Sequence, residues 1–250
     1  MLRVFNCIFI LYINIQMNTF DIFICCGGKC GGTTLAHTFH QNGYKTTHLH
    51  SSKHLGNFKS SIDVNNTFNI INASKQLGPI YIIDSYRTPV ERKISCFFQK
   101  IHVYLPNYAT MEIKDIIEYF NENILFSSVG NHHPINEFLT NYKMPLFHKF
   151  NFKRQYNISN KGNIIFIKVL FSDINEWGKI LSQVLDKEIV IHNANMTEDK
   201  TINSLYKQFK NTYRLPKSYL SKLEDDIEFK IYTSAYEQKK YLAKWTKLSV

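Results

Sequence analysis

Apolar and polar positions follow two different periods along this chain. Short continuous apolar runs, rich in Ile, Val and Phe, predict strands that are buried on both sides. Longer stretches with an apolar residue every three or four positions predict amphipathic helices between and after these runs. Because strands that are separated by helices usually pair in parallel, the pattern predicts a three-layer α/β/α fold with a mostly parallel sheet. The predicted strands are 20–25, 44–50, 79–84 and 163–171.

The predicted helices are marked by their apolar faces and, in places, by residues that end or cap them. The first runs from Thr33 to Gln41 and is ended by Asn42-Gly43. Ser172 is expected to cap a helix that follows the last strand. Residues 126–162 show neither period, and we expect them to form an irregular, variable lobe that binds substrate. Further helices are predicted at 111–125, 198–213, 216–227 and 229–247.

Residues 1–19 are expected to form an extension before a single domain that spans 20–250. The apolar stretch 4–15 contains two asparagines and is short for a membrane-spanning helix. We favour an added strand, or an extension ahead of a start at Met17, and expect no stable membrane insertion. A membrane anchor or secretory targeting by 4–15 stays open. The five cysteines lack the pairing density of a secreted scaffold, which favours a reducing compartment such as the cytoplasm.

The chain is basic, with 30 Lys and Arg against 20 Asp and Glu and a formal net charge of +10. The excess is concentrated between Glu137 and Asp173, where no acidic residue occurs. Such a field favours an anionic partner, namely nucleotide phosphates, acidic or sulfated glycans, nucleic acid or a membrane surface. The cations of this segment are Lys143, Lys149, Lys153, Arg154, Lys161 and Lys168.

A glycine-rich loop, "ICCGGKCGGTTLAHTF" at 24–39, joins the first strand to the first helix. In this setting backbone amides and the helix dipole converge on one point, and glycines let the backbone approach a bound anion. The dinucleotide pattern is not matched because Lys29 interrupts it, and the Walker pattern is not matched because Lys29 precedes Thr33 by four residues. The loop therefore predicts a phosphate site of another kind, with a purely structural glycine turn as the alternative. The cysteines of the loop lack a second ligand cluster, so we expect no metal site.

The segment "KCGGTTL" resembles the 5′-phosphosulfate loop of sulfotransferases that use 3′-phosphoadenosine 5′-phosphosulfate, in the form seen in heparan sulfate sulfotransferases. The segment "IIDSYRTPVERKISCFF" at 82–98 resembles the 3′-phosphate motif of the same family, with Arg87 and Ser95 eight residues apart. Thr88 stands where the family usually has an aspartate. Taken alone, Arg92 in this segment would be a solvated cation. Later segments resemble sulfotransferase-like proteins labelled as capsular polysaccharide synthesis proteins, so the resemblance spans about 20–245.

The resemblance implies a P-loop-like fold, 3′-phosphoadenosine 5′-phosphosulfate as the sulfuryl donor, no metal, and a carbohydrate or polysaccharide acceptor rather than nucleic acid. It implies that Lys29 neutralises the leaving phosphate and that Arg87 and Ser95 bind the 3′-phosphate. Lys200 and Asn195 would lie over the nucleotide. The 5′ group would be held by the loop residues Gly28, Lys29, Cys30, Gly31, Gly32, Thr33 and Thr34.

An acceptor hydroxyl needs a base, and two histidines lie at the end of the predicted strand 44–50. His48 and His50 are two residues apart and therefore share a face of the strand. We prefer His50 as the base, with His48 second and the pair His132 and His133 in reserve. Heparan sulfate 2-O-sulfotransferases carry their histidine just before the Arg-x-Pro strand, and residues 55–80 contain none here.

Two other functions stay open on the sequence. A kinase-like nucleotide-binding protein would keep the fold and the phosphate loop, but its metal would need an acidic ligand at a strand end, and only Asp84 is evident. A non-catalytic protein that binds glycan or nucleic acid would use the basic, aromatic stretch around Lys149 and Phe152. The sequence does not indicate an oligomeric state.

Overall fold

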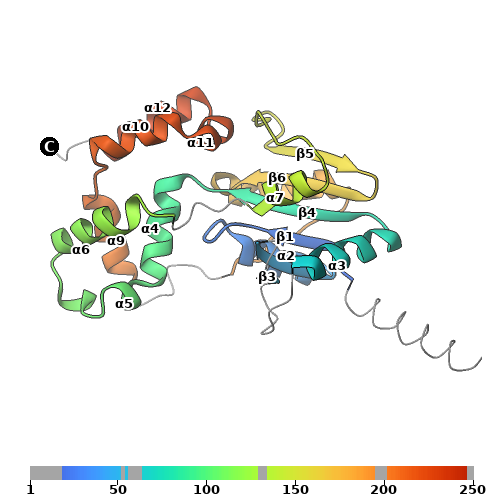
Figure 1. Ribbon diagram of the computed structural model, residues 1–250, viewed down its shortest axis with the longest axis horizontal. Coiled ribbons are helices and arrows are strands. Elements are labelled where there is room, and N and C mark those ends of the chain that lie inside the picture. Colours follow the sequence, from blue (N-terminus) through green and yellow to red (C-terminus); the bar gives the residue numbers. More distant parts are fainter. Residues whose placement is uncertain (1–18, 52–53, 56–63, 129–133, 195–201, 247–250) are drawn as a thin grey trace, which may run out of the picture.

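The computed structural model describes residues 19–51, 54–55, 64–128, 134–194 and 202–246. Within these ranges a six-stranded sheet has the order β3-β2-β1-β4-β6-β5 (Figure 1). The four central strands pair in parallel, and the short β3 and the strand β5 pair antiparallel at the two edges. The predicted α/β fold with a mostly parallel sheet is thus confirmed. The strands are β1 (Ile22–Cys25), β2 (Thr46–Ser51), β3 (His54–Leu55), β4 (Ile80–Tyr86), β5 (Tyr156–Lys161) and β6 (Ile164–Leu170).

Helices cover both faces of this sheet, which is why the central strands are apolar without interruption. In β1, Ile22 and Ile24 pack on one face, and Phe23 and Cys25 pack on the other. Burial on both faces removes the alternation of apolar and polar residues that a half-exposed strand would show. The first face is covered by α2 (Gly32–Gln41) and α8 (Trp177–Leu185), and the second by α3 (Val64–Leu77) and α7 (Pro134–Asn141).

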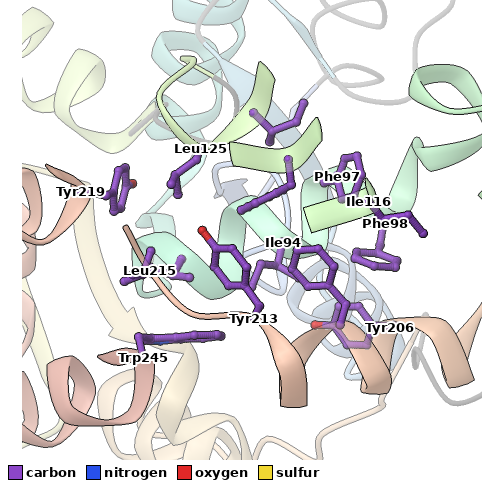
Figure 2. Close-up of a cluster of buried hydrophobic side chains, with 14 of the residues drawn as sticks. Ile94, Phe97, Phe98, Ile116, Leu125, Tyr206, Tyr213, Leu215, Tyr219 and Trp245 are labelled. Atoms are coloured by element: carbon purple, nitrogen blue, oxygen red, sulfur yellow. The ribbon is translucent and has the colours of Figure 1, made fainter. Parts of the chain in front are cut away.

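A helical lobe with its own aromatic core lies beyond the carboxyl ends of the parallel strands, at the left of Figure 1. Figure 2 shows Phe97 and Phe98 of α4 packing toward Tyr206 and Tyr213. The helix predicted at 198–213 is confirmed over 203–212, and its Tyr206 and Phe209 are buried in this core. The lobe contains α4 (Pro89–Gln99), α5 (Ile101–Tyr104), the 3-10 turn η1 (Tyr108–Thr110), α6 (Ile113–Phe120), the π-helical turn η2 (Asn121–Leu125), α9 (Asn203–Thr212), α10 (Lys217–Asp225), α11 (Ile227–Tyr232) and α12 (Ala235–Thr246).

Residues 126–162 are more regular than the sequence predicts. They contain α7, which packs on the sheet through Ile135, Phe138 and Leu139, and the edge strand β5. The alternation in β5 is hidden because most of its residues are polar and only Asn157 is buried. The helix α3 was likewise not predicted.

Two predicted helix boundaries are wrong. Ser172 caps no helix, because it lies inside the 3-10 turn η3 (Phe171–Glu176) and its hydroxyl donates to the Asp173 carboxylate. The helix predicted at 229–247 is two helices, α11 and α12, which are separated at Ser234. Ser234 and Glu237 begin α12 with reciprocal bonds between side chain and backbone, so the sequence carried a start signal there.

Several predictions fall on residues outside the described ranges. These residues include the apolar stretch 4–15, the histidine pair His132 and His133, and the two polar residues Asn195 and Lys200. In the ranges that are described, no helix has both the length and the apolar character needed to cross a bilayer.

Candidate functional site

The glycine loop leaves β1 at Cys25 and turns sharply into α2. The Cys30 amide donates to the Gly27 carbonyl at 3.3 Å, and two residues of the turn, Lys29 and Gly31, have positive φ values of 66° and 83°. The first bond of the helix runs from the Leu35 amide to the Gly31 carbonyl at 3.0 Å. The amides of residues 32–34 therefore have no acceptor within the helix, which is the usual condition at a helix start. They form a group of donors at the positive end of the helix dipole.

The two glycines that begin α2 have no room for a side chain. A Cβ atom on Gly31 would lie 2.7 Å from Trp177 and 3.1 Å from Phe171, and its φ value already favours glycine. A Cβ on Gly32 would lie 2.9 Å from the Cβ of Cys26 and would overlap the imidazole of His48. The backbone of the loop is thus packed tightly against Trp177, Phe171 and His48 at these two glycines.

His48 is the predicted base whose position the structure shows. Its ring lies on the α2 face of β2, with Nε2 and Cε1 against Gly32. His48 therefore adjoins the glycine loop, at the start of α2. His50 belongs to β2, but its side chain is outside the described part of the chain.

The two threonines of the loop have different surroundings. Thr33 is exposed at the helix start, whereas Thr34 is 6% exposed and its hydroxyl donates to the Ala194 carbonyl at 3.2 Å. Thr38, one turn further along α2, exchanges two bonds with the backbone of His192. Thr34 therefore helps to hold residues 190–194 along the helix, a role that the sequence did not indicate.

Arg87 connects the two predicted phosphate motifs. It follows the last residue of β4, and its Nη1 donates to the Lys29 carbonyl at 2.9 Å. Its guanidinium also lies over the Phe171 ring, 4.5 Å from the centroid. Hydrogen bonding on one side and stacking on the other fix the plane of the guanidinium. Residues 58 positions apart are thereby brought into one site, as the sequence predicts.

The helix α4 presents a second arginine to the loop. Arg92 is 3% exposed, and it lies close enough to the Cys30 thiol to lower the pKa of that thiol against the larger, opposite effect of burial. One turn later the Cys96 sulfur lies 4.0 Å from the Gly28 carbonyl oxygen. Ser95, the predicted phosphate ligand, is 7% exposed and lies three residues after Arg92 on the same helix. The expectation that Arg92 is a solvated cation is wrong, because α4 packs on both the loop and the helical lobe.

Thr88 takes the N-cap position of α4 without capping the backbone. Its hydroxyl donates to the Glu91 carboxylate at 2.8 Å, and Glu91 also accepts from Tyr241 and pairs with Lys244 at 2.7 Å. Glu91 thus connects α4 to α12, and Thr88 donates to the same carboxylate.

Further cations surround the site. Lys210 on α9 has its pKa lowered, first by burial and then by the positive charges of Lys244 and Arg87. The pKa of Lys93 is lowered to about 8, first by burial and then by Arg92. Each of these two lysines therefore lies close to other positive charges, in addition to the effect of burial. The sequence pattern did not single out Lys210, because it is far from both motifs in the chain.

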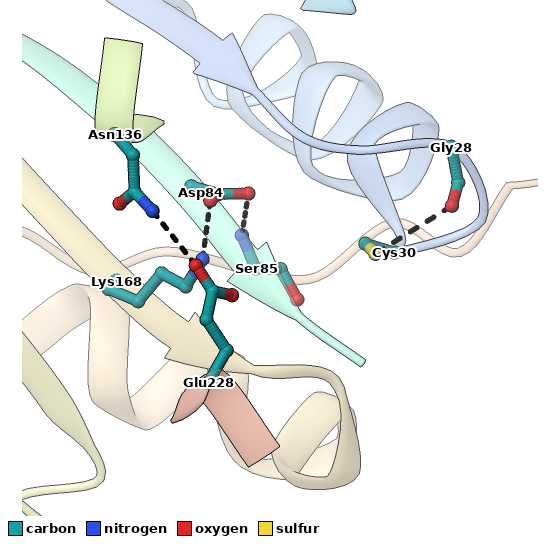
Figure 3. Close-up of polar contacts among 7 residues, drawn as sticks. All are labelled: Gly28, Cys30, Asp84, Ser85, Asn136, Lys168 and Glu228. Atoms are coloured by element: carbon teal, nitrogen blue, oxygen red, sulfur yellow. Dashed lines mark hydrogen bonds and ion pairs between the residues drawn. The ribbon is translucent and has the colours of Figure 1, made fainter. Parts of the chain in front are cut away.

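Asp84, the one carboxylate that a kinase-like site had available at a strand end, is already engaged. Its Oδ2 lies 2.5 Å from Nζ of Lys168, and its Oδ1 accepts from the Ser85 amide at 2.7 Å. Figure 3 shows the two side chains reaching toward one another from neighbouring strands. Negative charge on Asp84 raises the pKa of Lys168 against the effect of burial, so the pair is ionic. Among the described residues, no three His, Cys, Asp or Glu side chains are grouped as a metal site requires.

A cavity of about 700 Å³ lies in the basic, aromatic segment. It does not include the loop, but Phe150 on its wall packs against Tyr86 and Leu170, the residues just before Arg87 and Phe171. Asn157 holds the wall by accepting from the Asn151 amide and donating to the Lys149 carbonyl. The lining includes Phe147, His148, Lys149, Phe152, Arg154 and Tyr156, and no acidic residue.

Comparison with protein-family models, with curated proteins and with solved structures found no match to this chain.

Proposed function

We propose that this protein is a sulfotransferase with a P-loop-like fold that moves a sulfuryl group from 3′-phosphoadenosine 5′-phosphosulfate to a hydroxyl or amine of a carbohydrate-type acceptor. The observation that carries the proposal is the 2.9 Å hydrogen bond between Arg87 and the Lys29 carbonyl. It joins a glycine loop without the Walker lysine to an arginine at the end of the neighbouring parallel strand. A nucleotide with phosphates at both its 5′ and 3′ positions suits two such adjacent anion sites.

The residues present fit this donor in three respects. The amides at the start of α2 supply neutral donors, and Lys29 and Arg87 supply positive charge. Gly31 and Gly32 let the loop backbone pack directly against Trp177 and His48, which fixes these amides in position. Ser95 lies on the helix that follows Arg87, where a hydroxyl would meet the same phosphate.

The roles of the residues follow from the charges that change during transfer. When bound, the nucleotide supplies a sulfuryl group, whose S–O bond to the 5′-phosphate breaks as the acceptor oxygen bonds to sulfur. Lys29 and the loop amides stabilise the electron pair that remains on the phosphate oxygen. His50, with His48 second, removes the acceptor proton, a contribution of about 10²- to 10⁴-fold. Since the loop is packed from behind by His48 and Trp177, these donors are already in place before binding.

The cavity near Phe150 supports a carbohydrate acceptor. Aromatic rings stack on sugar faces, and cations meet carboxylate or sulfate groups. Phe152 is 37% exposed on this wall, beside Lys149 and Arg154. The packing of Phe150 on Tyr86 places the cavity next to the strand ends that carry Arg87 and Phe171.

Ligand-dependent thermal stability tests the proposal. We expect adenosine 3′,5′-bisphosphate to raise Tm by several degrees at 100 times its Kd, and ATP with magnesium to do so much less, because only the first has a 3′-phosphate. A larger shift with ATP and magnesium would contradict the proposal and favour a kinase-like protein.

A second candidate is a non-catalytic protein that binds a polyanion, which the same basic cavity favours. In that case a sulfated or acidic polysaccharide would stabilise the protein and neither nucleotide would. Arg154→Gln would remove that stabilisation, whereas Arg87→Ala would leave it unchanged.

A further inference from the structure

Arg92 carries a buried positive charge with no anionic partner among the described residues. Its side chain is 3% exposed, and its Nε has no hydrogen-bond partner. Ion pairs within the described residues include those of Lys114, Lys168 and Lys244, none of which involves Arg92. Buried arginines are normally paired, because a charge that leaves water without compensation is costly.

No carboxylate forms an ion pair with Arg92 among the described residues, although Asp226 and Glu228 lie close enough to Tyr86 to raise its pKa. Burial raises the pKa of the Cys30 and Cys96 thiols, so both are neutral near pH 7. The phenol of Tyr86 is neutral for the same reason. Lys93, the next residue, has the same sign of charge, and its lowered pKa shows that the two repel.

The position of Arg92 indicates which anion would compensate it. The guanidinium contacts Cys30, two residues before the helix start whose amides lack acceptors. Cys96, one turn along α4, contacts Gly28 on the same loop. The unpaired charge and the unpaired amides therefore belong to one site, and each is an independent sign that an anion binds there.

We propose that Arg92 is the buried counter-charge of an anion bound at the glycine loop, and that it destabilises the protein until the anion binds. This inference rests on the anion site of the proposed function, but not on the identity of the nucleotide. It assigns Arg92 a binding role beside Arg87 and Ser95, and it makes the stability of the loop dependent on its ligand. Function and stability are then opposed at one residue, a common condition in binding sites.

The decisive experiment is the melting of Arg92→Met and Arg92→Gln, each with and without ligand at low ionic strength. Without ligand, Arg92→Met should melt about 2–4 °C above the wild type, because it removes an uncompensated charge and keeps the apolar stem. Inorganic pyrophosphate should stabilise the wild type, and both variants should lose affinity for it by about 10-fold or more. Arg92→Gln controls for any packing defect that the Met side chain introduces.

Lys168 is the matched control, because it is an equally buried cation that has a partner. Lys168→Met should lower Tm, since it leaves Asp84 buried and unpaired, and it should not weaken pyrophosphate binding. If both Arg92 variants melt below the wild type, or bind pyrophosphate as tightly, Arg92 is structural and the inference is wrong. A wild type that no phosphate anion stabilises also overturns it. If pyrophosphate binding behaves as expected but adenosine 3′,5′-bisphosphate binds no better than ADP, the sulfotransferase proposal fails and this inference stands.

Discussion

The imidazole of His48 occupies the space that a side chain on Gly32 would need. Its Cε1 lies 2.8 Å from the position of a Cβ on Gly32, and the Cβ of Cys26 lies at 2.9 Å. The strand that carries a candidate base and the helix that begins the anion site are thus packed against each other at one glycine. A substitution at either His48 or Gly32 should therefore disturb the packing of the other.

Gly32→Ala should lower both stability and ligand binding. The added methyl group must displace His48 or shift the start of α2, and overpacking of this kind costs about 1–3 kcal/mol. Thermal melts with and without adenosine 3′,5′-bisphosphate would measure both effects. Gly78→Ala is the control, because nothing lies within 4 Å of its Cβ position. Adding His48→Ala should recover part of the lost stability, and no recovery would show that Cys26 is the main obstacle.

Arg87→Ala should remove the preference for a 3′-phosphate. A charged hydrogen bond contributes about 1.5–3 kcal/mol, so the wild type should bind adenosine 3′,5′-bisphosphate roughly 10- to 100-fold tighter than AMP. The variant should bind the two alike. Arg87→Lys should behave nearly as poorly, because lysine cannot both stack on Phe171 and donate to the Lys29 carbonyl in the fork geometry. A retained preference in Arg87→Ala would place the 3′-phosphate elsewhere.

Measurements of kcat and of nucleotide affinity should distinguish the roles of His48 and His50. His50→Ala should lower kcat by about 10²- to 10⁴-fold while the affinity for adenosine 3′,5′-bisphosphate stays unchanged, as expected for a base. His48→Ala should alter nucleotide affinity as well, because it opens a space behind Gly32. If His50→Ala keeps full activity while His48→Ala loses it, then His48 is the base.

The stability of the fold should depend on Asp84 and Lys168 as a pair, so that removing one partner costs more than removing both. Lys168→Met should destabilise the fold by about 3–5 kcal/mol, because it leaves the Asp84 carboxylate uncompensated. The double variant Asp84→Leu with Lys168→Met should be markedly more stable than Lys168→Met alone. Denaturant unfolding of the two single variants and the double variant would give the coupling energy, and additive losses would mean that the pair does not interact.

Lys93 should make stability rise with pH in the alkaline range. Its pKa is lowered from 10.5 to about 8 in the folded state, first by burial and then by Arg92. Between pH 8 and 10.5 the unfolded chain binds more protons than the folded chain does. The cost of burying the charged lysine is therefore full below about pH 8 and is relieved as the pH rises toward 10.5. The difference in unfolding free energy between the wild type and Lys93→Met should therefore shift in favour of the wild type from pH 7 to 9.5. A difference that does not change with pH would contradict this assignment.

The apolar runs were enough to predict the parallel strands and the helices on both faces, because burial on two sides leaves an unbroken apolar signal. The same signal was absent from β5, whose residues are mostly polar and of which only Asn157 is buried. The proximity of Arg87 to the loop was also predictable, since the carboxyl ends of adjacent parallel strands meet at one edge of the sheet.

The sequence by itself determined the strand, loop and helix that form the proposed anion site, because glycine, apolar periodicity and helix ends act locally. Only the tertiary structure decided which polar side chains are buried there. Nothing in the sequence distinguishes Arg92 from Lys168 as a buried cation. In the structure Arg92 lies near Cys30 without an ion-pair partner, whereas Lys168 is paired with Asp84. The physical reason is that the cost of a buried charge depends on what packs around it, and those neighbours come from distant parts of the chain.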